Sequence, residues 1–160
     1  MADEIELKWV LKSFTELSLA ELYVLMQKRQ EVFVLEQDCP YLDADGKDEK
    51  CHHLLGFDGN DLLAYSRLVP LGLIYPEVSI GRVLTTAKGR GAGLGYRLMG
   101  KTIEAVRQLY GKQPIRISAQ SHLERFYHSF GFNPTGKNYL EDGIPHMEML
   151  REASHFEEEA

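Results

Sequence analysis

The most informative segment of this chain, residues 78–119, reads VSIGRVLTTAKGRGAGLGYRLMGKTIEAVRQLYGKQPIRISA. Residues 78–85 are rich in β-branched side chains, which favour a strand. From Gly93 to Tyr110 apolar residues recur at helical spacing, which predicts a long amphipathic helix. Residues 114–119 return to a strand pattern. Strand, helix and strand in this order form a βαβ unit, so the segment predicts a locally parallel pair of strands.

The rest of the chain alternates strands and helices without a linker. A capping box of Ser18 and Glu21 predicts the start of an early helix, and Ser121 with Glu124 predicts another. Further strand patterns lie at residues 5–11, 53–57 and 62–69, with a hairpin turn at 58–61 and a closing hairpin from 132 to 151. We therefore predict an α/β fold, α+β by some schemes, with a mixed, mostly antiparallel sheet and flanking helices.

Composition restricts the function. A chain of 160 residues suits one domain, which we place at 1–153, followed by an acidic tail at 154–160. The net charge of −6 argues against a nucleic-acid or anionic-membrane partner, because phosphate contacts need clustered Lys and Arg. The acidic N-terminus has no signal-peptide pattern, no apolar run could span a bilayer, and two cysteines suit a reducing compartment. These features predict a cytoplasmic protein.

A glycine-rich loop, Arg90-Gly91-Ala92-Gly93-Leu94-Gly95, lies between the predicted strand and the long helix. Glycines let a backbone approach a ligand closely, and the free N–H groups at a helix N-terminus favour an anion such as a phosphate. A flexible loop is the alternative, but the strand before it and the helix after it favour phosphate binding. The loop lacks the Gly-Lys-Ser/Thr ending of a Walker loop and the spacing of a Rossmann site.

Two other clusters suggest metal sites. Cys39, Cys51, His52 and His53 lack the paired short spacings of zinc ligands. Residues 43–48 read DADGKD but lack the later bidentate glutamate of a calcium loop, so we expect a solvated loop there. We predict no metal.

At the glycine loop the chain resembles a known family. Residues 90–95 are similar to the pyrophosphate signature Arg/Gln-x-x-Gly-x-Gly/Ala of the GNAT superfamily of N-acetyltransferases. Phe126-Tyr127 followed by Gly131-Phe132 is similar to its second hallmark, an aromatic pair and a Gly-Phe around a later helix. The wider pattern resembles the ElaA-like branch of that superfamily. It comprises VFVLEQ at 32–37, CPY at 39–41, DGKD at 45–48, IGRV at 80–83, SAQ at 118–120 and EDGIPH at 141–146.

The resemblance implies a binding site for acetyl-CoA. Backbone amides of the glycine loop would hold the pyrophosphate, and the strand at 78–85 would pair with the pantetheine arm as an added strand would. In this family that strand and the one at 115–119 splay apart, and the acetyl group lies in the gap. The implied cofactor-binding residues are Val83, Leu84, Thr85, Arg90, Gly91, Ala92, Gly93, Leu94, Gly95 and Gln120. Gln120 departs from the pattern, because many members carry an asparagine in this stretch.

The implied reaction is direct attack of a primary amine on the thioester, the amine belonging to a small molecule or a peptide. Tyr127 takes the place of the family's general acid, which protonates the departing thiolate. A free amine titrates near pH ~10.4, so a base should help remove its proton. Glu36 and His146 lead the candidates for this base, ahead of Glu141 and Asp142. Two alternatives stay open: a non-catalytic acyl-CoA-binding module of the same fold, and a phosphate-binding protein for another nucleotide.

Overall fold

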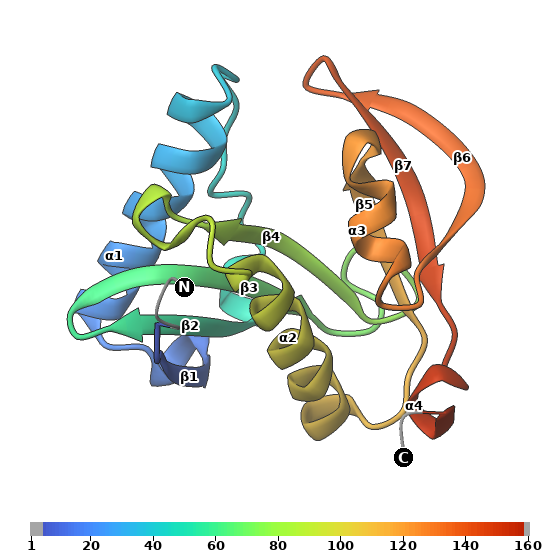
Figure 1. Cartoon of the computed structure of the whole chain (residues 1–160), viewed down its shortest axis with the longest axis horizontal. Coiled ribbons are helices and arrows are strands. Elements are labelled where there is room, and N and C mark those ends of the chain that lie inside the picture. The colour runs from blue at the N-terminus through green and yellow to red at the C-terminus, as the bar shows by residue number, and fades with distance from the viewer. Residues whose placement is uncertain (1–4, 159–160) are drawn as a thin grey trace.

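The computed structural model describes residues 5–158, which form two antiparallel sheets with helices packed around them (Figure 1). The strands are β1 Lys8–Ser13, β2 His52–Asp58, β3 Asp61–Val69, β4 Ser79–Thr85, β5 Ile115–Gln120, β6 Asn133–Glu141 and β7 Ile144–Arg151. The helices are α1 Leu19–Arg29, α2 Leu94–Tyr110, α3 Glu124–His128 and α4 His155–Glu158. Short helical segments are η1 Phe14–Glu16, η2 Gln30–Glu36, η3 Asp48–Lys50, η4 Ala87–Gly89 and η5 Ser121–Leu123.

One sheet has the order β1-β2-β3-β4, and the other has the order β5-β7-β6. Both predicted hairpins are confirmed. The first turns at Gly59 and Asn60 between β2 and β3, and the second turns at Asp142 and Gly143 between β6 and β7. Gly59, Asp142 and Gly143 have positive φ angles of 59°, 50° and 78°, which tight turns require.

The expected parallel pair does not form a ladder. β4 and β5 belong to different sheets, and one isolated parallel bridge joins Val78 to Ile115. In β4 a bulge places Arg82 and Val83 opposite the single residue Ser66, because Tyr65 pairs with Leu84 while Arg67 pairs with Gly81. Bulges bend a strand and increase its twist, which accounts for the separation of the two strands beyond the bridge.

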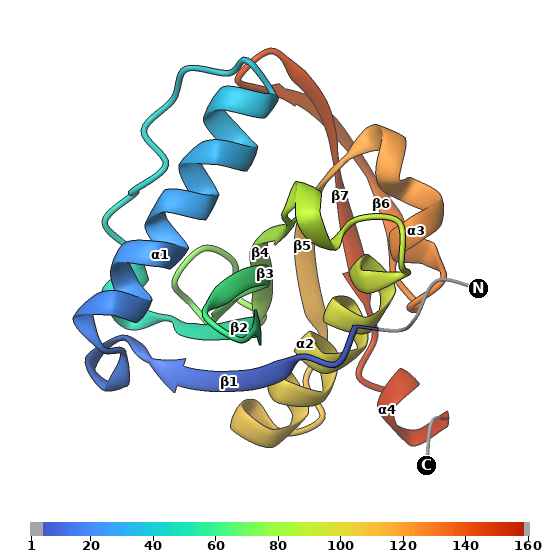
Figure 2. The same ribbon diagram turned by 60° about the vertical axis from the view of Figure 1, so that its left-hand side comes forward.

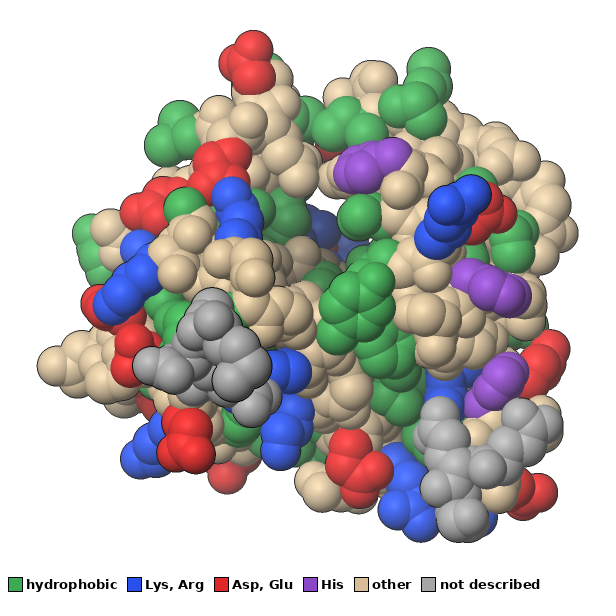
Figure 3. Space-filling model, in the orientation of Figure 1, with side chains coloured by type: hydrophobic (Ala, Val, Ile, Leu, Met, Phe, Trp, Pro, Cys, Tyr) green, Lys and Arg blue, Asp and Glu red, His purple; other side chains and the backbone are tan. Residues whose placement is uncertain are grey.

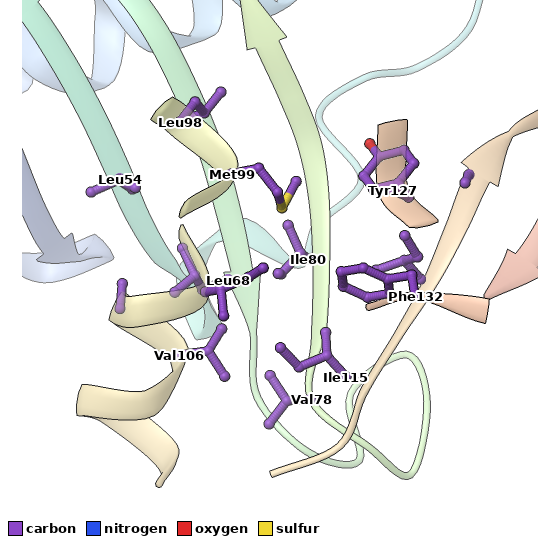
Figure 4. Packing of buried hydrophobic residues seen from close by; sticks show 14 of the residues in the cluster. Leu54, Leu68, Val78, Ile80, Leu98, Met99, Val106, Ile115, Tyr127 and Phe132 are labelled. Atoms are coloured by element: carbon purple, nitrogen blue, oxygen red, sulfur yellow. The ribbon is translucent and has the colours of Figure 1, made fainter. Parts of the chain in front are cut away.

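Two apolar clusters fix the helices on opposite faces of the four-stranded sheet (Figure 2). α2 packs one face with residues that include Leu98 and Met99, and this cluster continues to Ile115 of the second sheet and to Phe132, which precedes β6 (Figure 4). α1 covers the other face, where Leu25 is buried as its helical spacing predicts. The larger cluster therefore holds the two sheets together.

The ends of the helices test the capping predictions. Ser18 caps α1, since its hydroxyl accepts a hydrogen bond from the Glu21 N–H at 3.0 Å and Glu21 accepts one from the Ser18 N–H at 2.8 Å. The second capping box is wrong. Ser121 begins the short segment η5, and α3 starts three residues later without a side-chain cap.

The predicted acidic tail is helical and partly packed as far as residue 158. Residues 155–158 form α4, and the ring of Phe156 is only 4% exposed in the core. The Arg151 guanidinium lies 4.5 Å from the centre of that ring. The acidic composition concealed the one apolar residue that attaches this segment. Residues 155–158 thus pack on the domain that precedes them, and residues 159–160 lie outside the described part of the chain.

Candidate active site

A cavity of about 580 Å³ opens between the two sheets. It is lined by residues of η2 and the loop after it, of β3, β4 and β5, of α3, and of the β6–β7 hairpin. Figure 3 shows it as a hollow between two lobes, with Lys or Arg atoms visible at its bottom. Its volume suits a small-molecule site. The separation of β4 from β5 is what creates this space.

The glycine loop leads from η4 into α2. Gly91 and Gly93 have φ angles of 92° and 70°, and a Cβ at either position would meet nothing within 4 Å. The first backbone bond of α2 runs from the Arg97 N–H to the Gly93 carbonyl at 3.2 Å, so the preceding N–H groups of the first turn have no helical acceptor. This open, positively polarised helix end fits a pyrophosphate. Leu94 is buried in the core, so only its backbone is available there.

Arg90 connects this loop to η2. Its Nη2 lies 2.7 Å from the Glu36 carboxylate and 2.7 Å from the Thr85 carbonyl oxygen. Arg90 lines the cavity, whereas Glu36 does not. The role of Glu36 as a base stays a prediction, and in the structure its carboxylate holds the Arg90 side chain over the end of β4.

Val83, Leu84 and Thr85 of β4 line the cavity, as the predicted pairing with a pantetheine arm requires. Gln120 lines it from β5, and its amide donates to Gln37 at 3.3 Å. The structure thus brings together β4, Gln120 and Arg90, while residues 91–95 lie beyond the cavity lining.

Tyr127 lies on α3 and lines the cavity, although the residue is only 8% exposed. Its ring packs against Phe126 and Phe132, and Figure 4 shows its hydroxyl on the side of the ring away from Phe132. No described residue forms a hydrogen bond with this hydroxyl. Burial raises the pKa of Tyr127 to about 12, so the phenol is neutral at physiological pH and keeps its proton for donation.

His146 lies across the cavity on β7. Its Nδ1 is 2.7 Å from the Ile144 carbonyl oxygen, which can only accept, so Nδ1 carries a hydrogen. In the neutral ring Nε2 then carries the lone pair that can accept a proton. Nε2 lies 3.2 Å from Glu141 Oε2. This arrangement can accept a proton at Nε2 and stabilise the resulting cation. Asp142, the remaining candidate base, also lines the cavity.

The loop at 43–48 is not the solvated loop that its composition suggested. Asp43 and Asp48 are buried, and both accept hydrogen bonds of 2.7 Å from Arg29, a residue with no exposed surface. Burial alone would raise the pKa of Asp48, but the hydrogen bonds and charges of Arg29 and Arg67 lower it. Ion pairing offsets the desolvation cost of burying these carboxylates.

Two further arginines extend this network to the cavity. Arg67 donates to both oxygens of Asp45 at 2.9 Å and to Asp48 at 3.0 Å. Arg82 donates to Asp43 at 2.8 Å. Sequence analysis missed Arg67 and Arg82, because a charged residue inside a strand pattern gives no indication of its partners, which lie up to 39 residues away. The only signal was a charged side chain within a strand pattern.

The cysteines and histidines considered as zinc ligands have other contacts. Cys39 and Cys51 are buried free thiols, and His53 is bonded to the Tyr65 hydroxyl at 2.7 Å. Within residues 5–158, no three His, Cys, Asp or Glu side chains are grouped as a metal would need. Nor does that part of the chain contain a helix long and apolar enough to cross a membrane.

Comparison with known proteins agrees with this geometry. A family model described as an acetyltransferase (GNAT) domain matches residues 56–153, more than half of the chain. The chain belongs to the GNAT family. Within that family it is 43% identical to protein ElaA of Escherichia coli K12 over 148 residues, which cover 91% of this chain and 97% of ElaA. The predicted relationship to the ElaA-like branch is thereby confirmed.

Two solved structures are similar over nearly the whole chain. An acyl-CoA N-acyltransferase from Pseudomonas aeruginosa has a TM-score of 0.88 and 43% identity, covering 91% of this chain and 99% of the other. The crystal structure of Escherichia coli ElaA has a TM-score of 0.85 and 42% identity, with the same coverage. The chain is thus a GNAT-family acyltransferase by domain and by structure, with antiparallel sheets as in its fold family.

Proposed function

We propose that this protein transfers an acetyl group from acetyl-CoA to a primary amine by direct attack on the thioester. The observation that carries the proposal is the cavity itself. It runs from Arg90 beside the glycine loop to the hydroxyl of Tyr127 and the imidazole of His146. A proton donor and a proton acceptor thus share one space, and the helix end that would bind the phosphates follows Arg90 at its border. The acyl-CoA named for the Pseudomonas aeruginosa relative supports the choice of cofactor.

The residues of this chain supply positions for the cofactor. The amides of residues 91–95 would bind the pyrophosphate at the start of α2. The edge of β4 from Val83 to Thr85 would pair with the pantetheine arm, and the gap between β4 and β5 would hold the thioester. Leu84 and Gln120 would contact the arm from either side of that gap.

Acyl transfer requires one proton to leave and another to arrive. His146 Nε2 would accept a proton from the nitrogen of the neutral amine as it attacks, and Glu141 would stabilise the imidazolium. The amine nitrogen forms a bond to the carbonyl carbon as the bond to sulfur breaks. Tyr127 would then protonate the thiolate, whose charge would be costly next to the buried apolar ring system around Tyr127. Glu36 would act indirectly by fixing Arg90.

Two measurements test the proposal. Acetyl-CoA should raise the melting temperature, since a ligand bound only by the folded state stabilises it by ~2.7 kcal/mol at a hundredfold excess over Kd. ATP and NAD at the same concentration should not, which separates this protein from a general nucleotide binder. An amine library with acetyl-CoA should then release free thiol. Thermal stabilisation without thiol release from any amine would favour the second candidate, a non-catalytic acyl-CoA-binding module.

A further inference from the structure

The end of the cavity beneath the β4 bulge is basic. Lys47, Arg67 and Arg82, which we call the basic floor, all line it. Figure 3 shows Lys or Arg atoms at the bottom of the hollow. A site for a simple cationic amine would place carboxylates there, because like charges repel. The floor therefore points to an acceptor that also carries negative charge.

The charges around the floor do not cancel. Three guanidiniums, of Arg29, Arg67 and Arg82, are matched by three carboxylates, of Asp43, Asp45 and Asp48. Lys47 adds a fourth positive charge, and its ammonium forms no ion pair with any described residue. One positive charge at the cavity wall thus has no partner within residues 5–158.

A hydrogen-bond donor is also left over. Arg67 is 2% exposed, and its Nε has no acceptor among the described residues, although both Nη atoms are bonded. An unpaired buried donor is costly, and an arginine most often meets such a need with a carboxylate. Because Arg67 lines the cavity, its guanidinium adds to the positive charge at the wall where a ligand would bind.

The bulge in β4 holds the floor in place. Arg82 has a φ of 49°, a left-handed conformation that is unfavourable for a residue other than glycine. Its guanidinium is fixed by Asp43, at 2.8 Å from Oδ1 and 3.1 Å from the main-chain oxygen. Strain of this kind persists where surrounding structure enforces it, often at functional sites.

We propose that the acetyl acceptor is a small amino acid or amino-acid-like amine whose carboxylate binds the basic floor. This inference rests on the proposed acetyltransferase function. The single surplus charge of Lys47 matches the one negative charge of a carboxylate better than the two of a phosphate dianion. The amine is then directed toward His146 and Tyr127. Its nitrogen acquires the acetyl group, its proton passes to His146, and the products are an N-acetyl amino acid and free coenzyme A.

The experiment compares matched acceptors that differ only in the carboxylate. Phenylalanine is paired with phenethylamine, lysine with cadaverine, and each amino acid with its amide, with thiol release as the signal. We expect kcat/KM to be about tenfold or more higher for the acid in at least one pair, the effect of a charge-assisted hydrogen bond. Lys47→Met should reduce that preference several-fold through KM. Lys50→Met is the matched control, because Lys50 is exposed and does not line the cavity, and should keep the preference.

The results separate the two proposals. Equal or better turnover of the amines without carboxylate in every pair would overturn the acid acceptor and leave the transferase function intact. If no acceptor reacts although acetyl-CoA binds, a second measurement tests the inference. It compares the melting temperature of the CoA-saturated protein in the presence of N-acetyl amino acids and of N-acetyl amines. Equal stabilisation by both product types would sink the acid acceptor. A protein that does not bind acetyl-CoA fails the proposed function first, and the acceptor inference falls with it.

Discussion

The hydroxyl of Tyr127 is a single group whose removal should separate chemistry from packing. Tyr127→Phe keeps the ring contacts with Phe126 and Phe132 and removes a hydroxyl that bonds no described residue. We expect kcat to fall by roughly 10²–10⁴ where chemistry limits turnover, because proton transfer to the thiolate is lost. The melting temperature and the Kd for acetyl-CoA should change little. Steady-state kinetics and thermal melting measure both effects.

Tyr110→Phe is the matched control. Tyr110 also lies on a helix and is partly buried, but it does not line the cavity. This variant should keep kcat within a few-fold. Because burial raises the pKa of Tyr127 to about 12, the wild type should also keep its acid up to alkaline pH. Near-normal kcat in Tyr127→Phe would show that another group protonates the thiolate.

Individual residues differ in how well the sequence revealed them. Tyr127 and the glycine loop could be found because each belongs to a local motif of a few residues. Glu36 could be singled out only by the subfamily pattern around it, and its partner Arg90 is 54 residues away and cannot be inferred from spacing. The same holds for Arg29, which reads as a helical surface residue and yet has no exposed surface.

Among the elements, the turn into α2 has the clearest mutational test. Gly93 has a φ of 70° at the helix start, and a side chain there meets open space. Gly93→Val should therefore leave the fold intact at a cost of about 1–3 kcal/mol of backbone strain. The branched side chain would stand over the free amides of the first turn. We expect the Kd for acetyl-CoA, measured by calorimetry, to rise at least about tenfold.

Gly100 provides the control for this element. It lies in the same helix, is exposed, and likewise has nothing within 4 Å of an added Cβ, but its φ is not positive. Gly100→Ala should raise the stability by up to ~1 kcal/mol and leave acetyl-CoA binding unchanged. If Gly93→Val bound acetyl-CoA as tightly as Gly100→Ala does, the pyrophosphate would have to bind elsewhere.

Elements with strong local patterns were predictable, and their pairing was not. The spacing of apolar residues located α2, and turn residues located both hairpins, because each signal acts within a few residues. The predicted parallel ladder between β4 and β5 does not form, because a bulge at Arg82 and Val83 bends β4. That bulge arises from the register of β4 against β3. A register shift between distant strands leaves no trace in the sequence of either strand.

At the scale of the whole molecule, ion pairs bury the loop at 43–48, which was expected to lie on the surface. The loop at 43–48 is attached to α1 by Arg29, to β3 by Arg67 and to β4 by Arg82. These ties bring one wall of the cavity against the four-stranded sheet. Breaking one of these buried ion pairs would leave the other charge uncompensated, which is costly. The ion pairs therefore hold this wall of the cavity in place.

The C-terminal segment gives the last test, at the scale of the whole fold. Phe156 is 4% exposed within the cluster that joins both sheets, and the Arg151 guanidinium lies over its ring. Phe156→Ala should lower the free energy of unfolding by about 3–5 kcal/mol, since it leaves a cavity in the core. For a domain of this size that corresponds to a fall in melting temperature of roughly 6–20 °C. Glu157→Ala, at the exposed neighbouring position, should change stability by less than about 0.5 kcal/mol. Similar melting temperatures for the two variants would mean that residues 154–158 behave as the dispensable acidic tail that their composition suggested.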